Sequence, residues 1–263
     1  MKKLIFVNQK GGSGKSILSY NMAHYLADMG QRVLFIDGDE QANSSKSLAQ
    51  FTVKNMGASA LFNKAEIVLP AQVSNITLLH GDAGLRKVEQ SPTEDSELVA
   101  CLIDRLASIA DRFDYAVIDT AGANSRVANA LLIVSNFAVL PCRVDPYSID
   151  VATEVIRRIN FVQQNFNHGL LNLGILPNEI DACSHCQQQW LEQLIDAYPQ
   201  FVMSVRVPKR SAYREACDAG VPVWRLRVDP SDGGQGNVKT SARIAGHEVR
   251  GAFKIIQNQM EQQ

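Results

Sequence analysis

Short apolar runs alternate along the chain with longer segments in which apolar residues recur every three or four positions. The runs favour buried strands, and the longer segments favour amphipathic helices. Strands are predicted at 3–8, 32–36, 76–80, 115–119, 136–141, 171–176 and 201–207. Helices are predicted at 14–29, 44–51, 98–112, 150–166, 183–198, 213–219 and 238–260, with another beginning at 57–62, and loops at 81–95 and 229–237.

Strands that alternate with helices indicate an α/β fold. We expect a single doubly wound, mostly parallel sheet flanked by helices. The run at 115–119 is uninterrupted, as in a central strand that is covered on both faces. No internal repeat or linker divides the chain, so residues 1–263 are predicted to form a single domain.

The first predicted strand leads into a glycine-rich loop, Gln-Lys-Gly-Gly-Ser-Gly-Lys-Ser at residues 9–16, and then into a helix. Glycines let successive N–H groups point at one anion, and the helix start adds unpaired N–H groups and a positive dipole end. Lys15 would reach the β- and γ-phosphates of a nucleotide, and the Ser16 hydroxyl would bind Mg²⁺. The position between strand and helix disfavours the alternative of a solvated turn. The predicted nucleotide-binding residues here are Lys10, Gly11, Gly12, Ser13, Gly14, Lys15, Ser16 and Ile17.

Carboxylates follow two of the predicted strands. Asp37 and Asp39 come after the second strand, and Asp119 ends the strand at 115–119. Asp119 is placed to hold Mg²⁺ through water, and Asp39 to position the attacking water. The metal-site residues are therefore Ser16, Asp39 and Asp119. Turn chemistry at a strand end is the structural alternative for Asp37 and Asp39.

Composition limits the other classes of protein. The formal net charge is −1 over 263 residues, so affinity for nucleic acid would have to come from a local patch. No segment has signal-peptide or transmembrane character, which predicts a cytoplasmic protein. Five cysteines argue against a disulfide framework. Cys183 and Cys186 could be half of a zinc site, but no second pair follows at suitable spacing, so two half-buried helix cysteines are the favoured interpretation.

Three motifs together resemble the ParA family of partition ATPases, within the deviant Walker A group that also contains MinD. They are Lys-Gly-Gly-Ser-Gly-Lys-Ser at 10–16, Asp-Gly-Asp-Glu-Gln-Ala-Asn at 37–43 and Tyr-Ala-Val-Ile-Asp-Thr at 115–120. A later segment, from Pro208 to Val223, is similar as well. The chain differs from the family pattern at Glu40, which replaces a proline, and at Ala121 and Gly122, which replace two prolines. The two missing prolines predict a looser segment after Asp119 and leave the timing of hydrolysis open.

The resemblance implies an ATPase that closes into a dimer around two ATP molecules. Lys10, which the ordinary phosphate loop lacks, would then cross to the partner's phosphates and offset their charge. Lys10, Lys15 and Asp39 become the expected catalytic residues, with ATP and Mg²⁺ as cofactors. Asn178 and Pro208 would lie around the adenine.

The resemblance further implies that the ATP-loaded homodimer binds DNA without sequence preference, and that a centromere-binding partner of the ParB type stimulates hydrolysis. Such a protein would associate with the nucleoid. Binding of this kind needs clustered cations. The candidates are Arg206, Lys209, Arg210, Arg214, Arg225 and Arg227, for which a solvated face is the alternative.

Other functions remain open at this point. Val249, Phe253, Ile256 and Met260 form an apolar stripe on the last predicted helix, as a MinD-like membrane anchor would. The mixed charges around this stripe favour packing on the sheet, so no membrane partner is expected. A ligase or kinase acting on a small molecule could use the same phosphate loop. An iron–sulfur reductase of the nitrogenase-iron-protein type is disfavoured, because residues 120–125 contain no cysteine.

Overall fold

The computed structural model describes all residues except 65, 72–73, 123, 229–235 and 263. Eight strands form one sheet in the order β3-β4-β2-β5-β1-β6-β7-β8, and every pairing between named strands is parallel. The strands are β1 (Lys2–Phe6), β2 (Val33–Gly38), β3 (Thr52–Gly57), β4 (Ile76–His80), β5 (Tyr115–Thr120), β6 (Phe137–Arg143), β7 (Leu171–Ile180) and β8 (Val207–Pro208). The expected fold class, a doubly wound parallel sheet, is confirmed.

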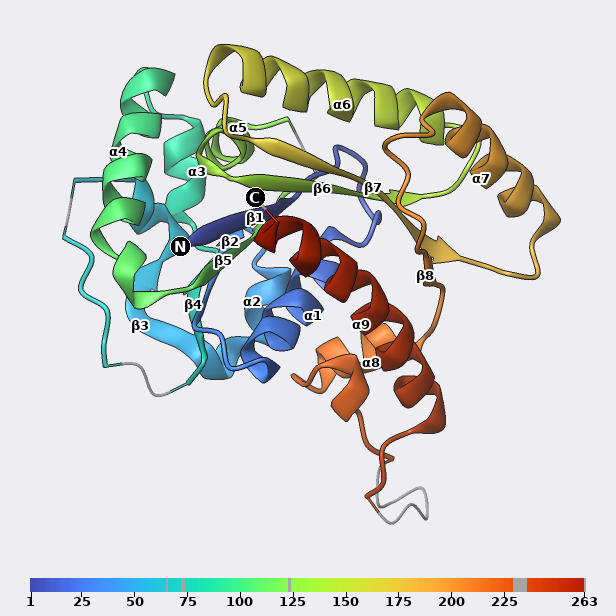
Figure 1. Ribbon diagram of the computed structural model, residues 1–263. Coiled ribbons are helices and arrows are strands. Elements are labelled where there is room, and N and C mark those ends of the chain that lie inside the picture. The colour runs from blue at the N-terminus through green and yellow to red at the C-terminus, as the bar shows by residue number, and fades with distance from the viewer. Residues whose placement is uncertain (65, 72–73, 123, 229–235, 263) are drawn as a thin grey trace.

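Helices cover both faces of the sheet (Figure 1). They are α1 (Lys15–Asp28), α2 (Asn43–Ser47), α3 (Gly84–Glu89), α4 (Asp95–Ser108), α5 (Arg126–Val134), α6 (Ser148–Asn165), α7 (His185–Ala197), α8 (Ala212–Asp218) and α9 (Thr240–Glu261). Short 3-10 turns lie at Ala49–Phe51, Ala58–Phe62, Ala110–Arg112 and Val223–Arg225. Helices α3 to α7 pack on one face, while α1, α8 and α9 pack on the other.

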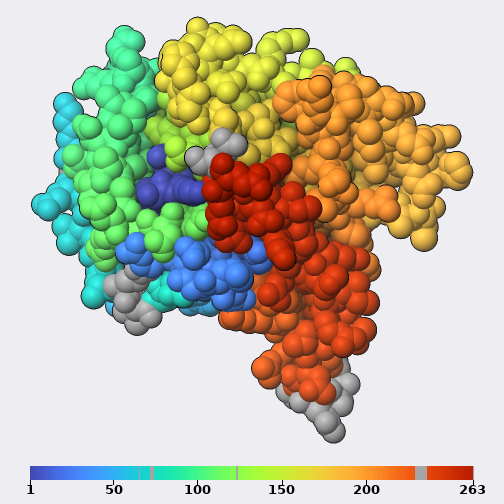
Figure 2. All heavy atoms as spheres, in the orientation of Figure 1, coloured from blue at the N-terminus to red at the C-terminus, as the bar shows by residue number. Residues whose placement is uncertain are grey.

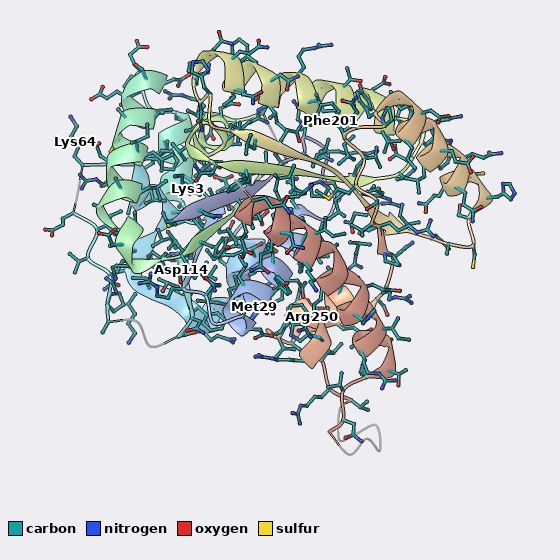
Figure 3. All side chains as sticks on the ribbon, viewed as in Figure 1. Lys3, Met29, Lys64, Asp114, Phe201 and Arg250 are labelled. Atoms are coloured by element: carbon teal, nitrogen blue, oxygen red, sulfur yellow. The ribbon has the colours of Figure 1, made fainter. Side chains whose placement is uncertain are left out.

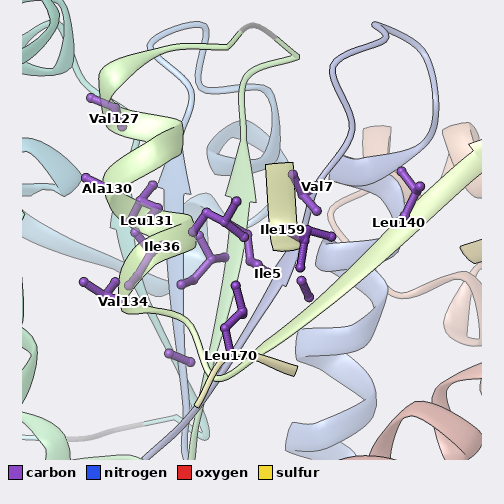
Figure 4. Packing of buried hydrophobic residues seen from close by; sticks show 14 of the residues in the cluster. Ile5, Val7, Ile36, Val127, Ala130, Leu131, Val134, Leu140, Ile159 and Leu170 are labelled. Atoms are coloured by element: carbon purple, nitrogen blue, oxygen red, sulfur yellow. The ribbon is translucent and has the colours of Figure 1, made fainter. Parts of the chain in front are cut away.

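The two-residue period of the strands builds these two layers. Along β1, Ile5 belongs to the hydrophobic cluster beneath α3–α7, whereas Leu4 and Phe6 belong to the cluster beneath α1, α8 and α9. Ile5 packs in the first cluster with residues such as Leu131 of α5 and Ile159 of α6 (Figure 4). A strand that buries both faces holds its carboxyl end at a fixed place, and the glycine-rich loop starts there.

Several predicted boundaries were wrong. The expected loop at 81–95 contains α3, which has few apolar residues but buries Leu85. The start of this helix is held by the Asp82 carboxylate, which accepts a hydrogen bond from the Gly84 nitrogen at 2.6 Å. The expected strand at 201–207 is reduced to β8 and one bridge between Val202 and Ile175. The helix expected to begin at 57–62 is a 3-10 turn, and the strand expected at 171–176 continues to Ile180. Strand β3 and helix α5 had not been predicted.

The helix predicted at 14–29 is α1, and Gly30, which follows it, has a φ of 81°, where L side chains are strained. Most of the expected loop at 229–237 lies outside the described residues. No helix in the described part of the chain has the length and apolar character needed to cross a membrane.

A buried histidine in α1 makes stability depend on pH. His24 is 4% exposed, its ring lies edge-on to Tyr20 and Phe51, and its Nε2 has no hydrogen-bond partner among the described residues. Burial, with a smaller contribution from Arg225, lowers the pKa of His24 to about 4. Because folding lowers the pKa of His24, the contribution of this residue to stability is fully present above pH 6.5, and it is lost as the pH falls through the folded-state pKa of about 4.

We expect His24 to lower the free energy of unfolding by about 3 kcal/mol when the pH is reduced from 7 to 4. Urea unfolding at a series of pH values measures the effect. A His24→Gln variant should lose this part of the acid dependence, and the exposed His247→Gln variant should keep it. Parallel acid limbs for the parent and His24→Gln would contradict the assignment.

Candidate functional site

The loop between β1 and α1 is a cradle of backbone N–H groups fixed at both ends. Gly12 and Gly14 have φ values of 73° and 90°, and Gly14 directly precedes α1. At the front, Asn8 accepts from the Lys10 nitrogen at 2.8 Å, and its own amide donates to the Pro141 carbonyl at 2.7 Å. The hydrogen bonds of Asn8 thus hold the front of the loop in an anion-binding shape.

Asn178 fixes the other end of the loop. Its buried amide donates to the Ser13 carbonyl oxygen at 2.8 Å. A Cβ at Gly14 would lie 2.0 Å from the same amide nitrogen, so glycine is needed there for contact as well as for φ. Asn178 lies within β7 rather than after a strand, and it pairs in register with Val207 beside Pro208. The structure thus brings Asn178 and Pro208 to the loop, and their expected role around the adenine stays a prediction.

Two buried polar groups in the loop are suited to an anion. Lys15 is 6% exposed, and burial lowers the pKa of its ammonium group, against the raising effect of the Asp119 and Asp39 carboxylates. The Ser13 hydroxyl is buried without a hydrogen-bond partner among the described residues. A phosphate placed on the N–H groups of the loop would supply a negative charge beside Lys15 and an acceptor for the Ser13 hydroxyl.

Asp119 at the end of β5 lies at the metal side of the cradle. Burial raises the pKa of its carboxyl group, while hydrogen bonds from Ser44 and Ser16 and the charge of Lys15 lower it. The Ser44 hydroxyl donates to Asp119 at 2.5 Å. The structure thus brings Ser16 and Asp119 together, and their role in holding Mg²⁺ stays a prediction. Their oxygens are the hard ligands that Mg²⁺ prefers, and one carboxylate leaves room for water and phosphate ligands.

Asp37 and Asp39 have different environments. Asp37 is fully buried, and its carboxylate accepts from the Ser45 hydroxyl at 2.5 Å and from the backbone nitrogens of Ser45 and Asp39 at 2.9 and 3.1 Å. Burial and the nearby Asp119 raise the pKa of Asp37 to about 7. The Asp37 carboxylate therefore stabilises the turn after β2, which agrees with the alternative of a structural role for this residue. Asp39 is only half-buried and accepts from the Gln41 nitrogen at 2.9 Å.

The segment after Asp119 covers the cradle. A Cβ built on Gly122 would lie 3.5 Å from the Lys15 Nζ and 3.4 Å from the Gly11 nitrogen. This is the place where the chain has Ala121 and Gly122 instead of prolines, so the difference from the family pattern falls next to the phosphate position. Ile17 lies just inside α1 and is half-buried.

Lys10 projects from the front of the loop and contacts its own chain. Its ammonium group forms an ion pair with Asp145 and lies 5.9 Å from the centre of the Tyr147 ring. Asp145 belongs to the turn before α6, where it accepts from the Tyr147 nitrogen at 2.9 Å. The Lys10 side chain is 40% exposed, so it remains accessible to a partner.

The predicted DNA-binding cations do not all remain free. Arg210 is paired with Glu248 of α9 at 2.6 Å, and Arg225 is paired with Asp28 of α1. These two pairs hold the helices of one face together. Arg206, Lys209 and Arg214 are exposed, as is Arg227, which donates to the Gly236 carbonyl at 3.2 Å. The candidate patch is therefore narrower than the sequence suggested.

Two other sequence hypotheses can be compared with the structure. Cys183 and Cys186 are both exposed, and Cys183 precedes α7, so the prediction of two half-buried helix cysteines was wrong. In the described part of the chain, no three His, Cys, Asp or Glu side chains gather as metal ligands. The apolar stripe Val249, Phe253, Ile256 and Met260 is completely buried in the core beneath α9.

The sequence also matches known proteins. Residues 1–171 match the family described as AAA domain, and residues 99–262 match the family described as VirC1 protein. Protein IncC of Escherichia coli is 31% identical over 271 residues, which cover 99% of this chain and 70% of IncC. The chain belongs to the ParA/MinD family of P-loop ATPases. The chromosome-partitioning ATPase Soj of Treponema pallidum is 27% identical over 230 residues, which cover 84% of this chain and 88% of Soj.

Solved structures share the fold of this family member. A McdA variant from Cyanothece in complex with ATP gives a TM-score of 0.77 at 18% identity, covering 98% of this chain and 96% of McdA. The septum site-determining protein MinD from Pyrococcus horikoshii, complexed with Mg-ADP, gives 0.68 at 18% identity and covers 98% of both chains. At this identity the likeness supports the fold alone.

Sequence reasoning had missed Asn8, Ser44, Ser45 and Asp145. Asn8 is the last residue of the first predicted strand, and the two serines directly follow the segment at 37–43, so position in the sequence was an available signal for these three. Nothing local pointed to Asp145, because its contact with Lys10 spans 135 residues.

Proposed function

We propose that the chain is a dimeric ATPase switch that binds DNA without sequence preference in its ATP state and positions plasmid or chromosomal DNA in the cytoplasm, on the nucleoid. The observation that supports this best is a phosphate loop with two lysines in different environments. Lys15 is buried in the cradle, whereas Lys10 stands at its front, paired with Asp145 and still partly exposed. A small-molecule kinase would need the first lysine and has little use for the second.

Each residue of the site has a different proposed role in binding and hydrolysing Mg²⁺·ATP. Backbone N–H groups of residues 11–16 and the Lys15 ammonium would hold the phosphates, and the Ser16 hydroxyl would bind Mg²⁺, with Asp119 acting through water. When bound, Mg²⁺ would neutralise part of the charge on the phosphates. Asp39 would orient the attacking water, and Lys10 would leave Asp145 to reach the phosphates in a second subunit.

The exposed cations Arg206, Lys209, Arg214 and Arg227 are the proposed DNA contacts. A dimer doubles this patch, so the nucleotide state would control DNA affinity even if the patch within each subunit stays the same. A centromere-binding partner of the ParB type would then stimulate hydrolysis and release the DNA.

Binding of non-specific duplex DNA tests the proposal. We expect binding with ATP and little with ADP or without nucleotide, and a steep decline with salt. Replacing Arg214 with glutamine should weaken binding and lower the slope of log K against log salt by about 1 for each phosphate that the variant no longer neutralises. Lys54→Gln, an exposed cation on β3 at the opposite edge of the sheet, is the matched control.

Two outcomes would count against this function. If the protein bound no DNA in any nucleotide state, DNA would not be its cargo, and a small-molecule substrate would be favoured. Equally weakened binding in Arg214→Gln and Lys54→Gln would indicate a diffuse electrostatic attraction and would place the DNA-binding surface elsewhere.

A further inference from the structure

A cavity of about 1040 Å³ lies on the face of the sheet that carries α3–α7, between α4, α5 and α6. Leu98 and Ile103 line it from α4, Ala130 and Ile133 from α5, and Phe161 from α6. Figure 2 shows this side of the molecule, with α4 in green, the end of α6 in yellow and the N-terminal residues in dark blue. None of the residues assigned to the nucleotide site lines this cavity.

The lengths of the three helices explain the hollow. Helix α5 has 9 residues, whereas α4 has 14 and α6 has 18. At 1.5 Å per residue, α5 is about 14 Å long between walls of about 21 and 27 Å. Helix α5, at the bottom of the cavity, therefore ends before the flanking helices α4 and α6 do. Beyond its end, Met1, Lys3 and Asn136 line the cavity near the amino ends of β1 and β6.

The rim of the cavity is unusually apolar. Ile103, Phe161 and Phe166 are 52%, 56% and 59% exposed, and all three line it. They are three of the nine large hydrophobic residues that are exposed among the described residues, so exposed apolar surface is concentrated here. Such a concentration is typical of a binding surface.

Two cations that form no ion pair among the described residues line this apolar space. The Arg158 Nε and Nη2 atoms are buried and make no hydrogen bond within that part of the chain, and the Lys3 side chain is about half-buried at the start of β1, where Figure 3 labels it. Burial lowers the pKa of both side chains, partly offset at Arg158 by Glu154. Arg126 also lines the cavity, but its guanidinium group donates to Asp95 at 2.7 Å and to the carbonyl groups of Val88, Ser91 and Thr93.

We propose that this cavity binds a free single-chain amphiphilic carboxylate, with its apolar chain along α5 and its carboxylate on Arg158 and Lys3. Buried guanidinium nitrogens without partners are costly, and a carboxylate offers the planar, bidentate acceptor that matches them. The volume lies at the upper end of the range of about 300–1,000 Å³ that is usual for small-molecule sites. A partner helix is about 10–12 Å wide, whereas a single alkyl chain is slender enough to enter between the helices, and the Arg158 side chain would turn to present its nitrogens to the carboxylate.

Sodium dodecanoate, kept below its micelle concentration, is the probe, and titration calorimetry is the measurement. We expect saturable binding with one site per chain, at least tenfold tighter than that of dodecanol or dodecyltrimethylammonium. Arg158→Gln should weaken dodecanoate binding at least tenfold. The matched control is Arg157→Gln, which alters the exposed neighbour on the same helix and should change nothing.

A second variant separates loss of the site from loss of folding. Ala107→Trp adds bulk from the exposed wall of α4 and should abolish dodecanoate binding while the circular dichroism spectrum and the thermal midpoint stay near those of the parent. Equal affinity for the three probes, an unchanged affinity in Arg158→Gln, or binding only to anionic phospholipid vesicles would overturn the proposal. ATP binding and DNA binding do not enter this test, so its result is independent of the proposed function.

Discussion

Replacing Lys15 with alanine should raise the dissociation constant for Mg²⁺·ATP by at least about 100-fold. Lys15 is buried at 6% exposure, so its ammonium group acts on the phosphates with little screening by solvent. Removing one partner of a buried, hydrogen-bonded charge pair costs about 2–5 kcal/mol, and each 1.4 kcal/mol is a factor of ten in affinity. ATPase activity and ATP-dependent DNA binding should disappear with the nucleotide.

The side chain has a second role that affects how this variant is read. Without nucleotide, Lys15 is the cation that interacts with both Asp119 and Asp39. Its removal leaves these carboxylates close to one another without that positive charge, so some loss of thermal stability is expected. Titration calorimetry with ATP in the presence of Mg²⁺ measures the affinity, and Lys46→Ala, an exposed lysine on α2, is the control. An affinity within about threefold of the parent would contradict the role of Lys15.

The framework of the fold was predictable because its signals are local. Buried strands such as β5 are continuous apolar runs, and the helices that cover them show a regular apolar stripe, as Leu98, Leu102 and Leu106 do on α4. Helix α3 was missed because a helix of six residues shows less than two turns of that pattern. The edge strand at 201–207 was overestimated because alternation alone does not supply a partner strand, and Pro208 cannot donate to one.

The residues of the phosphate loop could be predicted from the sequence, but the distant residues that hold this loop in place could not. The glycines, Lys15 and Ser16 are consecutive in sequence, so spacing alone placed them. Asn178 reaches Ser13 across 165 residues, and Arg225 reaches Asp28 across 197. No local pattern contains such contacts, which is why the anchoring of the loop and the neutralisation of two predicted DNA-binding arginines appear only in the folded chain.

Asp39 carries the other large expected effect, and this one depends on the proposed function. Asp39→Ala should leave ATP affinity within a few-fold of the parent but lower the rate of hydrolysis by about 100-fold or more, the usual scale for a residue that positions or activates the nucleophile. The half-buried carboxylate interacts with Lys15 through its charge, and its loss should leave the backbone cradle for the phosphates intact. With hydrolysis blocked, the ATP dimer should stay on DNA after a chase with excess ADP.

Two further variants separate charge from turn geometry. One Asp39 oxygen accepts from the Gln41 nitrogen at 2.9 Å, and Asp39→Asn keeps that acceptor while removing the charge. Hydrolysis should therefore fail in both Asp39 variants if charge and water positioning matter, and recover in Asp39→Asn if the turn alone matters. Glu40→Gln is the matched control, because Glu40 pairs with Arg86 at 2.9 Å, away from the loop. Single-turnover hydrolysis is the measurement, and a parental rate in Asp39→Ala would show that another group positions the water.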